Sequence, residues 1–463
     1  MQNRLFAKPI VTDSIENGLD RKGLKDLARR LNDINSERLK NTRDALPHRH
    51  KPFLDLLPLL LHTNHPLLPG YISHQAPAGI IHYKPSDEAV KAAKIFGRSF
   101  TYNTQQKDPD IDAVFLMGSV GTIAYSTNSD LDIWVCYKDN LQQEDINQLN
   151  IKCSLIEKWA DKIGLETHFF TMNASGFSDG KNKQLSNESS GSSQHFLLLD
   201  EFYRSAISLA GQTPSWWYVP SNCHNDYDNY LNVLLTKRYM NADQILDFGA
   251  ILSIPTDEFI SAGIWQLYKA IEAPYKSLIK LLLLESYANP SSSNITISEK
   301  LKTTVYSGDF KLPDLDPYIM SYRFIENYLT ERNEHDRLHL IRRCLYFKIN
   351  KPLTKPITHS KISWQREILE SLVKEWEWTK PYLKHLDNHR RWKAADVIEE
   401  KKLIVEELNR SYDFLKNLSI SENSEKKNND DDIRNSAAKG ELKILQRKLE
   451  AYYGTTAGKK DNI

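Results

Sequence analysis

Two aspartates in one short apolar segment are the residues of this chain best suited to chemistry. Asp130 and Asp132 stand on either side of Leu131, within residues 129–135 of the 463-residue sequence. In a strand, alternate side chains lie on the same face, so the two carboxylates would lie side by side while Leu131, Ile133 and Val135 point into the protein. Adjacent carboxylates repel each other unless a cation lies between them. The pair is therefore interpreted as a divalent metal site.

A glycine-serine turn precedes this pair. The apolar run 113–117 leads into Gly118 and Ser119, and Asp130 follows Ser119 by eleven residues. Glycine lets the backbone approach a ligand closely, and a helix after the turn would direct its free N–H groups at an anion. We expect Ser119 and the N–H groups of residues 118–121 to hold the β- and γ-phosphates. Such a turn beside a metal pair indicates chemistry on a nucleoside triphosphate.

This arrangement resembles the signature of the polymerase-β-like nucleotidyltransferase superfamily, which also requires a third carboxylate on a later strand. Residues 152–163 have helical spacing, Gly164 ends that helix, and residues 165–170 form a short predicted strand. The resemblance makes Glu166 the third acid, either as a metal ligand or as the acceptor of the hydroxyl proton. It also implies two Mg²⁺ or Mn²⁺ ions. For an Asp-x-Asp pair taken alone, solvated surface carboxylates are the alternative.

Longer segments resemble the class I adenylate cyclases of gamma-proteobacteria. They are NHPLLPGY (64–71), SDLDIWVC, KCSLIEKWA and the segments 192–211 and 263–287. The similarity extends from about residue 20 to about residue 455. It implies that ATP is cyclised to 3′,5′-cyclic AMP and pyrophosphate, by attack of the ribose 3′-hydroxyl on the α-phosphate. Members of this family continue into a C-terminal regulatory region through which the sugar phosphotransferase system acts, so we expect this chain to be the catalytic portion of a longer protein.

Two other functions are compatible with the same residues. Transfer of a nucleotidyl group to a separate acceptor, such as an RNA end, a protein hydroxyl or a small molecule, uses the same acids. A degenerate nucleotide-binding regulator is disfavoured, because a sensor does not need three converging carboxylates. The chain has 61 Lys and Arg against 60 Asp and Glu, a net charge of +1, whereas nucleic-acid-binding proteins usually have a basic surplus. The balance favours free ATP over a nucleic acid as the partner.

Three lysines are candidate triphosphate ligands. Lys269, Lys276 and Lys280 are seven and four residues apart, so they would share one face of a continuous helix. The resemblance implies that a lysine of the helical domain contacts the triphosphate as a point charge. Lys276 follows Pro274, a typical first-turn residue, and is the first candidate. A solvated basic stripe is the alternative.

Arg204 is a further candidate phosphate ligand, in a helical segment that follows the polar residues 172–193. This helix is expected to pack near the metal strands, and a surface ion pair is the alternative role of the arginine. Residues 172–193 are rich in Ser, Gly and Asn and are expected to form a mobile loop. The loop could be a lid over a triphosphate or a surface excursion.

Strand patterns are confined to the region of the aspartates, and helical periodicity dominates from residue 194 onward. The expected fold is α+β and mostly helical, with N-terminal helices, a small mixed nucleotidyltransferase-type sheet domain and a larger helical domain. The predicted domains are an N-terminal helical segment (1–75), the catalytic domain (76–215), a helical domain (216–420), a disordered linker (421–437) and a terminal helix and tail (438–463). Predicted helices include 18–45, 194–210, 242–251, 256–287 and 390–417.

The sequence also bears on the cellular compartment. No apolar run approaches the roughly 20 residues needed to span a bilayer, and residues 1–14 lack the apolar core of a signal peptide. The four cysteines lie far apart without metal-ligand spacing, so neither a zinc site nor a disulfide framework is indicated. We expect a cytoplasmic protein with reduced thiols and no membrane span.

Overall fold

The computed structural model describes residues 4–6, 8–10, 20–102, 108–127, 129–178, 194–289, 295–356 and 363–425. Within these ranges the fold is α+β and mostly helical, as predicted. The chain forms two compact units. The first comprises residues 1–192, 198–252 and 298–312, and the second comprises residues 193–197, 253–297 and 313–463.

The first unit begins with helices whose ends follow local capping rules. The helix predicted over 18–45 is α1 (Arg21–Ala45), and the side chain of Asp20 caps it by accepting a hydrogen bond from the Gly23 N–H at 2.6 Å. Next come α2 (Lys51–His62) and α3 (Asp87–Ala93), the latter capped by Ser86.

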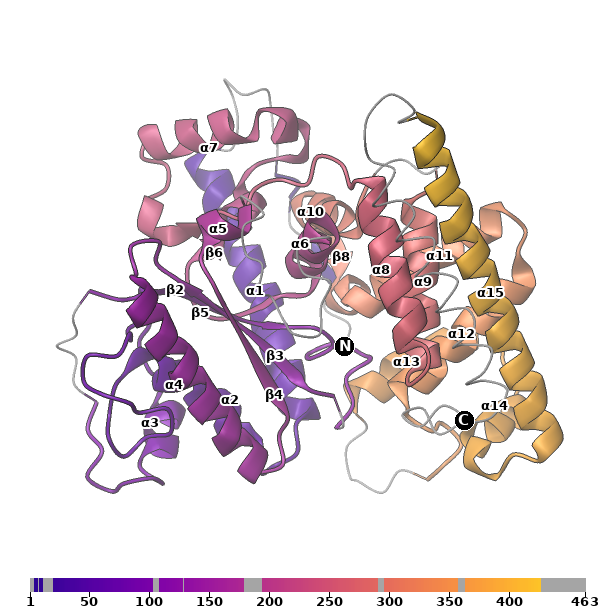
Figure 1. Cartoon of the computed structure of the whole chain (residues 1–463), viewed down its shortest axis with the longest axis horizontal. Coiled ribbons are helices and arrows are strands. Elements are labelled where there is room, and N and C mark those ends of the chain that lie inside the picture. The colour runs from indigo at the N-terminus through magenta and orange to yellow at the C-terminus, as the bar shows by residue number, and fades with distance from the viewer. Residues whose placement is uncertain are drawn as a thin grey trace. The chain divides into compact units, whose positions relative to one another are not determined.

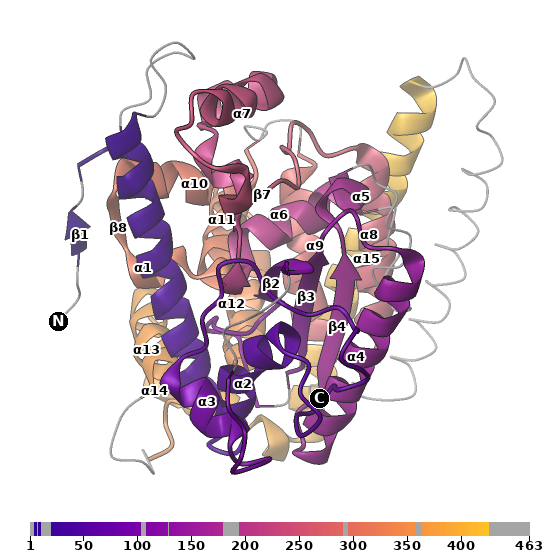
Figure 2. The same cartoon turned by 90° about the vertical axis from the view of Figure 1, so that its left-hand side faces the viewer.

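A four-stranded sheet forms the centre of the first unit (Figure 1). Its strand order is β4-β3-β2-β5, with β2 antiparallel to both β3 and β5 and β3 parallel to β4. A parallel pair needs a crossover connection, and α4 (Gln143–Lys162) supplies it. In Figure 2, α4 runs alongside β4. The strands are β2 (Ile111–Met117), β3 (Leu131–Tyr137), β4 (Thr167–Met172) and β5 (Ile207–Gly211).

One face of the sheet is the main apolar core of this unit. Leu131, Ile133 and Val135 of β3 are fully buried there, as the alternation of the sequence predicts. They belong to one cluster with apolar side chains of α2 and α4. The odd-numbered side chains of β3 therefore anchor the strand in the apolar core, and the even-numbered side chains lie on the opposite face of the sheet.

Aromatic side chains cover the middle of that opposite face. Trp134, only 3% exposed, stacks on Phe202 of α6 (His195–Ser205) with ring centroids 5.0 Å apart and an interplanar angle of 13°. The rings of Phe177 and Phe248 also pack against Trp134, with centroid distances of 5.7 and 6.4 Å. Phe177 belongs to α5 (Ala174–Ser178), so the predicted loop 172–193 begins with a short helix, and residues 179–193 lie outside the described ranges.

The helix predicted over 194–210 is too long. It ends at Ser205, and Ile207–Gly211 forms β5, which pairs with β2. Gly211 has a φ of +95°, and a Cβ placed there would lie 2.1 Å from the carbonyl oxygen of Asp112. Only glycine allows this close approach, and the backbone pairing with β2 outweighs the local helical pattern.

Short elements and two more α-helices, α7 and α10, complete the described part of the first unit. The helix predicted over 242–251 is wrong, because that segment contains η5, β7 and irregular backbone. The elements are β1 (Arg4–Phe6), β6 (Thr213–Pro214), η3 (Ser215–Tyr218), η4 (Ser221–Asp226), α7 (Tyr227–Thr236), η5 (Ala242–Gln244), β7 (Ile245–Leu246), α10 (Ile297–Ser307) and β8 (Asp309–Lys311). β1 pairs with β8, and β6 pairs with β7.

The predicted domain boundaries differ from these units. Apolar side chains between Leu39 and Leu68 share the core of the sheet, and α10 joins the same unit from far along the sequence. The buried ammonium of Lys302 donates to the Val219 carbonyl oxygen at 2.8 Å and lies 3.7 Å from the Trp216 ring centroid. A buried lysine needs such partners, so α10 is held in the first unit.

The second unit is helical. Its helices are α8 (Thr256–Lys269), α9 (Pro274–Tyr287), α11 (Pro317–Glu331), α12 (His335–Ile349), α13 (Trp364–Glu375), α14 (Lys380–Asp387) and α15 (Ala394–Glu425), with η6 (Leu312–Leu315) and η7 (His389–Arg391) between them. Buried ion pairs join three of these helices, because Arg337 of α12 lies 2.7 Å from Glu285 of α9 and 2.6 Å from Glu407 of α15.

Two predictions for this unit are wrong in part. The single helix predicted over 256–287 is two helices, because residues 270–273 form turns before Pro274. The linker predicted at 421–437 begins with five helical residues of α15. The rest of that linker and the predicted terminal helix lie outside the described residues. Among the described helices, none is both long enough and apolar enough to cross a membrane.

Candidate active site

The acids predicted from the sequence lie where two parallel strands begin. Asp130 is the residue before β3, and Glu166 is the residue before β4. The Leu131 N–H donates to the carbonyl oxygen of Glu166 at 3.0 Å, and the register then pairs Asp132 with His168. Because alternate residues share a face, four side chains form two adjacent rows on the face that also carries Trp134.

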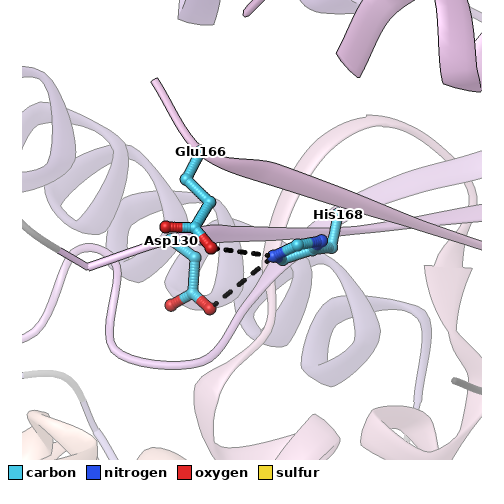
Figure 3. Close-up of side chains that lie close together, drawn as sticks. All are labelled: Asp130, Glu166 and His168. Atoms are coloured by element: carbon cyan, nitrogen blue, oxygen red, sulfur yellow. Dashed lines mark ion pairs between the residues drawn. The ribbon is translucent and has the colours of Figure 1, made fainter. Parts of the chain in front are cut away.

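Three of these side chains converge, as Figure 3 shows. The Nε2 atom of His168 lies 3.5 Å from Oε1 of Glu166 and 4.0 Å from Oδ2 of Asp130. One potential ligand atom from each residue lies within 4.8 Å of the other two. The side chains of Asp130, Glu166 and His168 are 49%, 69% and 47% exposed. The cluster is therefore open to solvent and to a ligand.

Asp132 lies between this open cluster and the buried aromatic side chains. It is half-buried, and its cross-strand partner on β2 is Met117. A Cβ added to Gly118 would lie 3.2 Å from Oδ2 of Asp132, and Gly118 has a φ of +83°. A side chain at position 118 would be strained and would press on the carboxylate, so glycine is required for both reasons.

The turn after β2 differs from the prediction in one respect. No helix follows Gly118-Ser119, since residues 118–124 form successive turns in which the N–H and hydroxyl of Thr122 donate to the Ser119 carbonyl oxygen, at 3.1 and 2.6 Å. Gly121 has a φ of +71°, and a Cβ there would lie 2.7 Å from Oγ1 of Thr42 on α1. Left-handed turns can also direct N–H groups at an anion. The phosphate-binding role of the turn stays a prediction.

Burial around the acids restricts which groups can change protonation. Tyr125 is 2% exposed, and burial raises the pKa of its hydroxyl to about 12, with the negative charge of Asp130 as a further cause. The phenol therefore remains neutral near pH 7 and adds no negative charge beside the carboxylates.

Arg204 has a buried partner. It is 9% exposed, and its Nε lies 3.1 Å from Oδ2 of Asp200, one helical turn earlier on α6. The other oxygen of Asp200 accepts a hydrogen bond from the Ser298 N–H at 3.0 Å. Arg204 therefore forms the ion pair that the sequence analysis gave as its alternative role. The pair is buried inside the unit and does not lie on the surface. A phosphate contact by Arg204 stays a prediction.

The candidate lysines lie on two helices of the second unit. Lys269 is the last residue of α8, with its ammonium 4.9 Å from the ring centroid of Trp265. Lys276 is the third residue of α9, and Lys280 follows one turn later. The prediction that all three share one helical face is wrong, because Pro274 begins a new helix after the turns at 270–273. A contact between any of them and a triphosphate stays a prediction.

His168 is the member of the cluster that sequence reasoning missed. It stands two residues after Glu166, as Asp132 stands two residues after Asp130. The alternation that placed the aspartates side by side therefore also places His168 beside Glu166. Applying that rule to every potential metal ligand, and not to carboxylates alone, would have found it.

Two family descriptions match most of the chain. "Adenylate cyclase NT domain" matches residues 23–217, and "Adenylate cyclase, class-I, second domain" matches residues 254–463. The first match contains the whole acid cluster, and the second contains α8, α9 and the candidate lysines. No solved structure matches the chain.

Curated relatives agree with these descriptions. The chain is 34% identical over 439 residues to the adenylate cyclase of Escherichia coli strain K12, and 35% identical over 440 residues to that of Yersinia intermedia. The adenylate cyclase of Proteus mirabilis is 33% identical over 442 residues. Each comparison covers 94% of this chain and 50% of the relative, so the chain spans about half the length of the curated relatives it matches. With both family domains present in order, the chain belongs to the class I adenylate cyclase family.

Proposed function

We propose that this chain cyclises ATP to 3′,5′-cyclic AMP and pyrophosphate at the carboxylates of Asp130, Asp132 and Glu166. The observation that carries the proposal is the placement of these acids on one face of β3 and β4, beside the Gly118 turn. Membership of the class I adenylate cyclase family supports ATP as the substrate and cyclisation as the reaction. Nucleotidyl transfer to a separate acceptor is the alternative.

The donor set fits divalent cations. Carboxylate oxygens are ligands that Mg²⁺ and Mn²⁺ prefer, and a cation relieves the repulsion between adjacent carboxylates. Asp130 and Asp132 would hold two ions, and Glu166 would complete the shell of one. When bound, these ions lower the pKa of the ribose 3′-hydroxyl and neutralise the charge that develops on pyrophosphate.

The chain's own groups have distinct roles in the proposed reaction. The ribose O3′ forms a bond to the α-phosphorus while the bond from that phosphorus to the bridging oxygen of pyrophosphate breaks. The 3′-hydroxyl loses its proton, for which the exposed carboxylate of Glu166 is the proposed acceptor. Ser119 and the N–H groups of residues 118–121 would hold the β- and γ-phosphates and align the leaving group.

Incubation with ATP and Mg²⁺ alone tests this proposal. We expect cyclic AMP and pyrophosphate in equal amounts, identified by mass, with no added acceptor. A reaction that starts only after an RNA, protein or small-molecule acceptor is added, and that attaches a nucleotidyl group to it, would instead assign nucleotidyl transfer. The same protein with Asp132→Asn serves as the control for a contaminating cyclase.

Lys276 is the lysine that we propose contacts the triphosphate. As the third residue of α9 it lies where the helix dipole disfavours a cation, so its position contributes nothing favourable to the helix itself. An anion at this end would be attracted both by the ammonium and by the positive end of the helix dipole. A charge that breaks a local rule in this way is characteristic of a binding residue.

We therefore expect Lys276→Ala to raise the KM for ATP by about tenfold to a hundredfold, the equivalent of losing one charge-assisted hydrogen bond of about 1.5–3 kcal/mol. Inhibition by pyrophosphate should weaken, and kcat should fall less than KM rises. Steady-state kinetics measure all three. Lys269→Ala, which removes a charge packed on Trp265, and Lys280→Ala are matched controls. Equal and negligible effects of the three substitutions would contradict the assignment.

A further inference from the structure

We propose that His168 is a nitrogen ligand to a divalent cation that it shares with Asp130 and Glu166, and that it makes this site prefer Mn²⁺ to Mg²⁺. The inference rests on the proposed function, because it concerns a cation that the acids would hold. It goes further in adding an imidazole to the ligands and in distinguishing one cation position from the other.

The distances within the cluster suit a single ion. In an octahedral shell with metal–ligand distances of about 2.1 Å, adjacent ligand atoms lie about 3 Å apart and opposite ones about 4.2 Å apart. Nε2 of His168 lies 3.5 Å from Glu166 Oε1 and 4.0 Å from Asp130 Oδ2, between these two values. Small side-chain rotations would bring all three atoms into one shell. The half-exposed side chains leave the remaining positions to water and phosphate oxygens.

The backbone holds His168 in place for this role. Its Cα is the register partner of Asp132 in the parallel pair of β3 and β4, and the next residue, Phe169, donates its N–H to Glu157 of α4 at 2.8 Å. The imidazole therefore comes from a paired strand and not from a loop, and such sites hold their geometry more closely. Glu166, by contrast, precedes the strand and can adjust.

The two cation positions then differ in chemistry. Asp130 and Asp132 offer only oxygen atoms, which suit Mg²⁺. Asp130, Glu166 and His168 offer two carboxylates and an imidazole. Affinity for nitrogen-containing sites rises along the first transition series from Mn²⁺, whereas Mg²⁺ favours oxygen ligands and water. The mixed site should therefore select Mn²⁺, and the oxygen-only site should discriminate less.

Mn²⁺ itself is the probe for the test. Mn²⁺ is titrated into the whole chain, with and without an unreactive ATP analogue, and its binding is followed by electron paramagnetic resonance. Pulsed measurements then detect any nitrogen coupled to the bound ion. We expect imidazole nitrogen coupling in the unmodified protein and its loss in His168→Gln. Mn²⁺ affinity should fall at least about tenfold, since even outer-shell partners of metal ligands cost about ten- to a hundredfold. Mg²⁺ affinity, from competition with Mn²⁺, should change by less than about threefold.

A second surface histidine provides a matched control. Nε2 of His82 lies 3.1 Å from Oδ2 of Asp243, with comparable exposure, but the cluster of three ligands does not include it. His82→Asn should leave Mn²⁺ affinity and nitrogen coupling unchanged. Thermal unfolding of both variants shows whether the fold is retained.

Three results would overturn the inference, and they separate it from the proposed function. Bound Mn²⁺ with oxygen ligands alone, in a protein that makes cyclic AMP, removes His168 as a ligand and leaves the function standing. Equal losses of Mg²⁺ and Mn²⁺ affinity in His168→Gln contradict the selectivity. A protein that binds neither cation and makes no cyclic AMP contradicts both proposals.

Discussion

Asp132→Asn is expected to lower cyclase turnover by at least about a thousandfold without unfolding the protein, because a cation's contribution of several kcal/mol to the transition state is lost. Asparagine keeps the size of the side chain and the fit against Gly118, but it removes the negative charge. Asp130→Asn should act in the same direction. Without metal, both variants should be as thermally stable as the unmodified protein or more so, because repulsion between carboxylates is relieved.

Two measurements test this prediction. One is product formation from ATP and Mg²⁺, and the other is thermal unfolding without metal. Asp112→Asn is the matched control, since Asp112 lies in β2 of the same sheet and is half-buried, but at the end away from Gly118. Burial raises the pKa of Asp112 to about 6, with nearby Asp139 adding to the rise and Lys138 opposing it. Its variant should keep normal turnover. Near-normal turnover of Asp130→Asn or Asp132→Asn would show that the metal assignment is wrong.

Glu166→Gln is expected to lower turnover by about a hundredfold to ten-thousandfold, the usual contribution of a positioned proton acceptor. Binding of ATP and of one cation should survive, because the coordination on the pyrophosphate side depends mainly on Asp130 and Asp132. Calorimetry with an unreactive ATP analogue measures the binding, and single-turnover kinetics measure the chemical step. Glu144→Gln removes an exposed carboxylate from the first turn of α4 and should change neither. If Glu166→Gln fails to bind the analogue, Glu166 has a structural role instead.

The features that sequence predicts best here are those that depend on neighbours along the chain. Alternation in residues 131–135 correctly assigned Leu131, Ile133 and Val135 to the core, and thereby placed Asp130 and Asp132 on the opposite face. The spacing of helix, Gly164 and strand correctly predicted the order of elements around Glu166, although the strand begins at Thr167, one residue after Glu166. Each of these inferences needs only the period of a strand or a helix.

Features that depend on long-range pairing were not predictable in the same way. Residues 207–211 continue the helical pattern of α6, and only their pairing with β2 makes them a strand. Alternation alone places His168 on the same face as Glu166, but its approach to Asp130 depends on the parallel pairing of β4 with β3 at one register. The break between Lys269 and Pro274 is indicated by the sequence itself, since proline disfavours a continuous helix, whereas the lysine spacing alone favours one helix.

The parallel register of β3 and β4 also bears on how chains of this kind can change length during evolution. Loss of one residue inside β3 would exchange its two faces, so that Asp132 would lie on the core face and Leu131 and Ile133 on the opposite face. Insertions between β3 and α4, at residues 138–142, shift no paired residue of the sheet. Length variation among relatives should therefore gather in such connections. Elsewhere between Asp130 and Glu166, residues should be gained or lost only where the pairing of Leu131 with Thr167 is left unchanged.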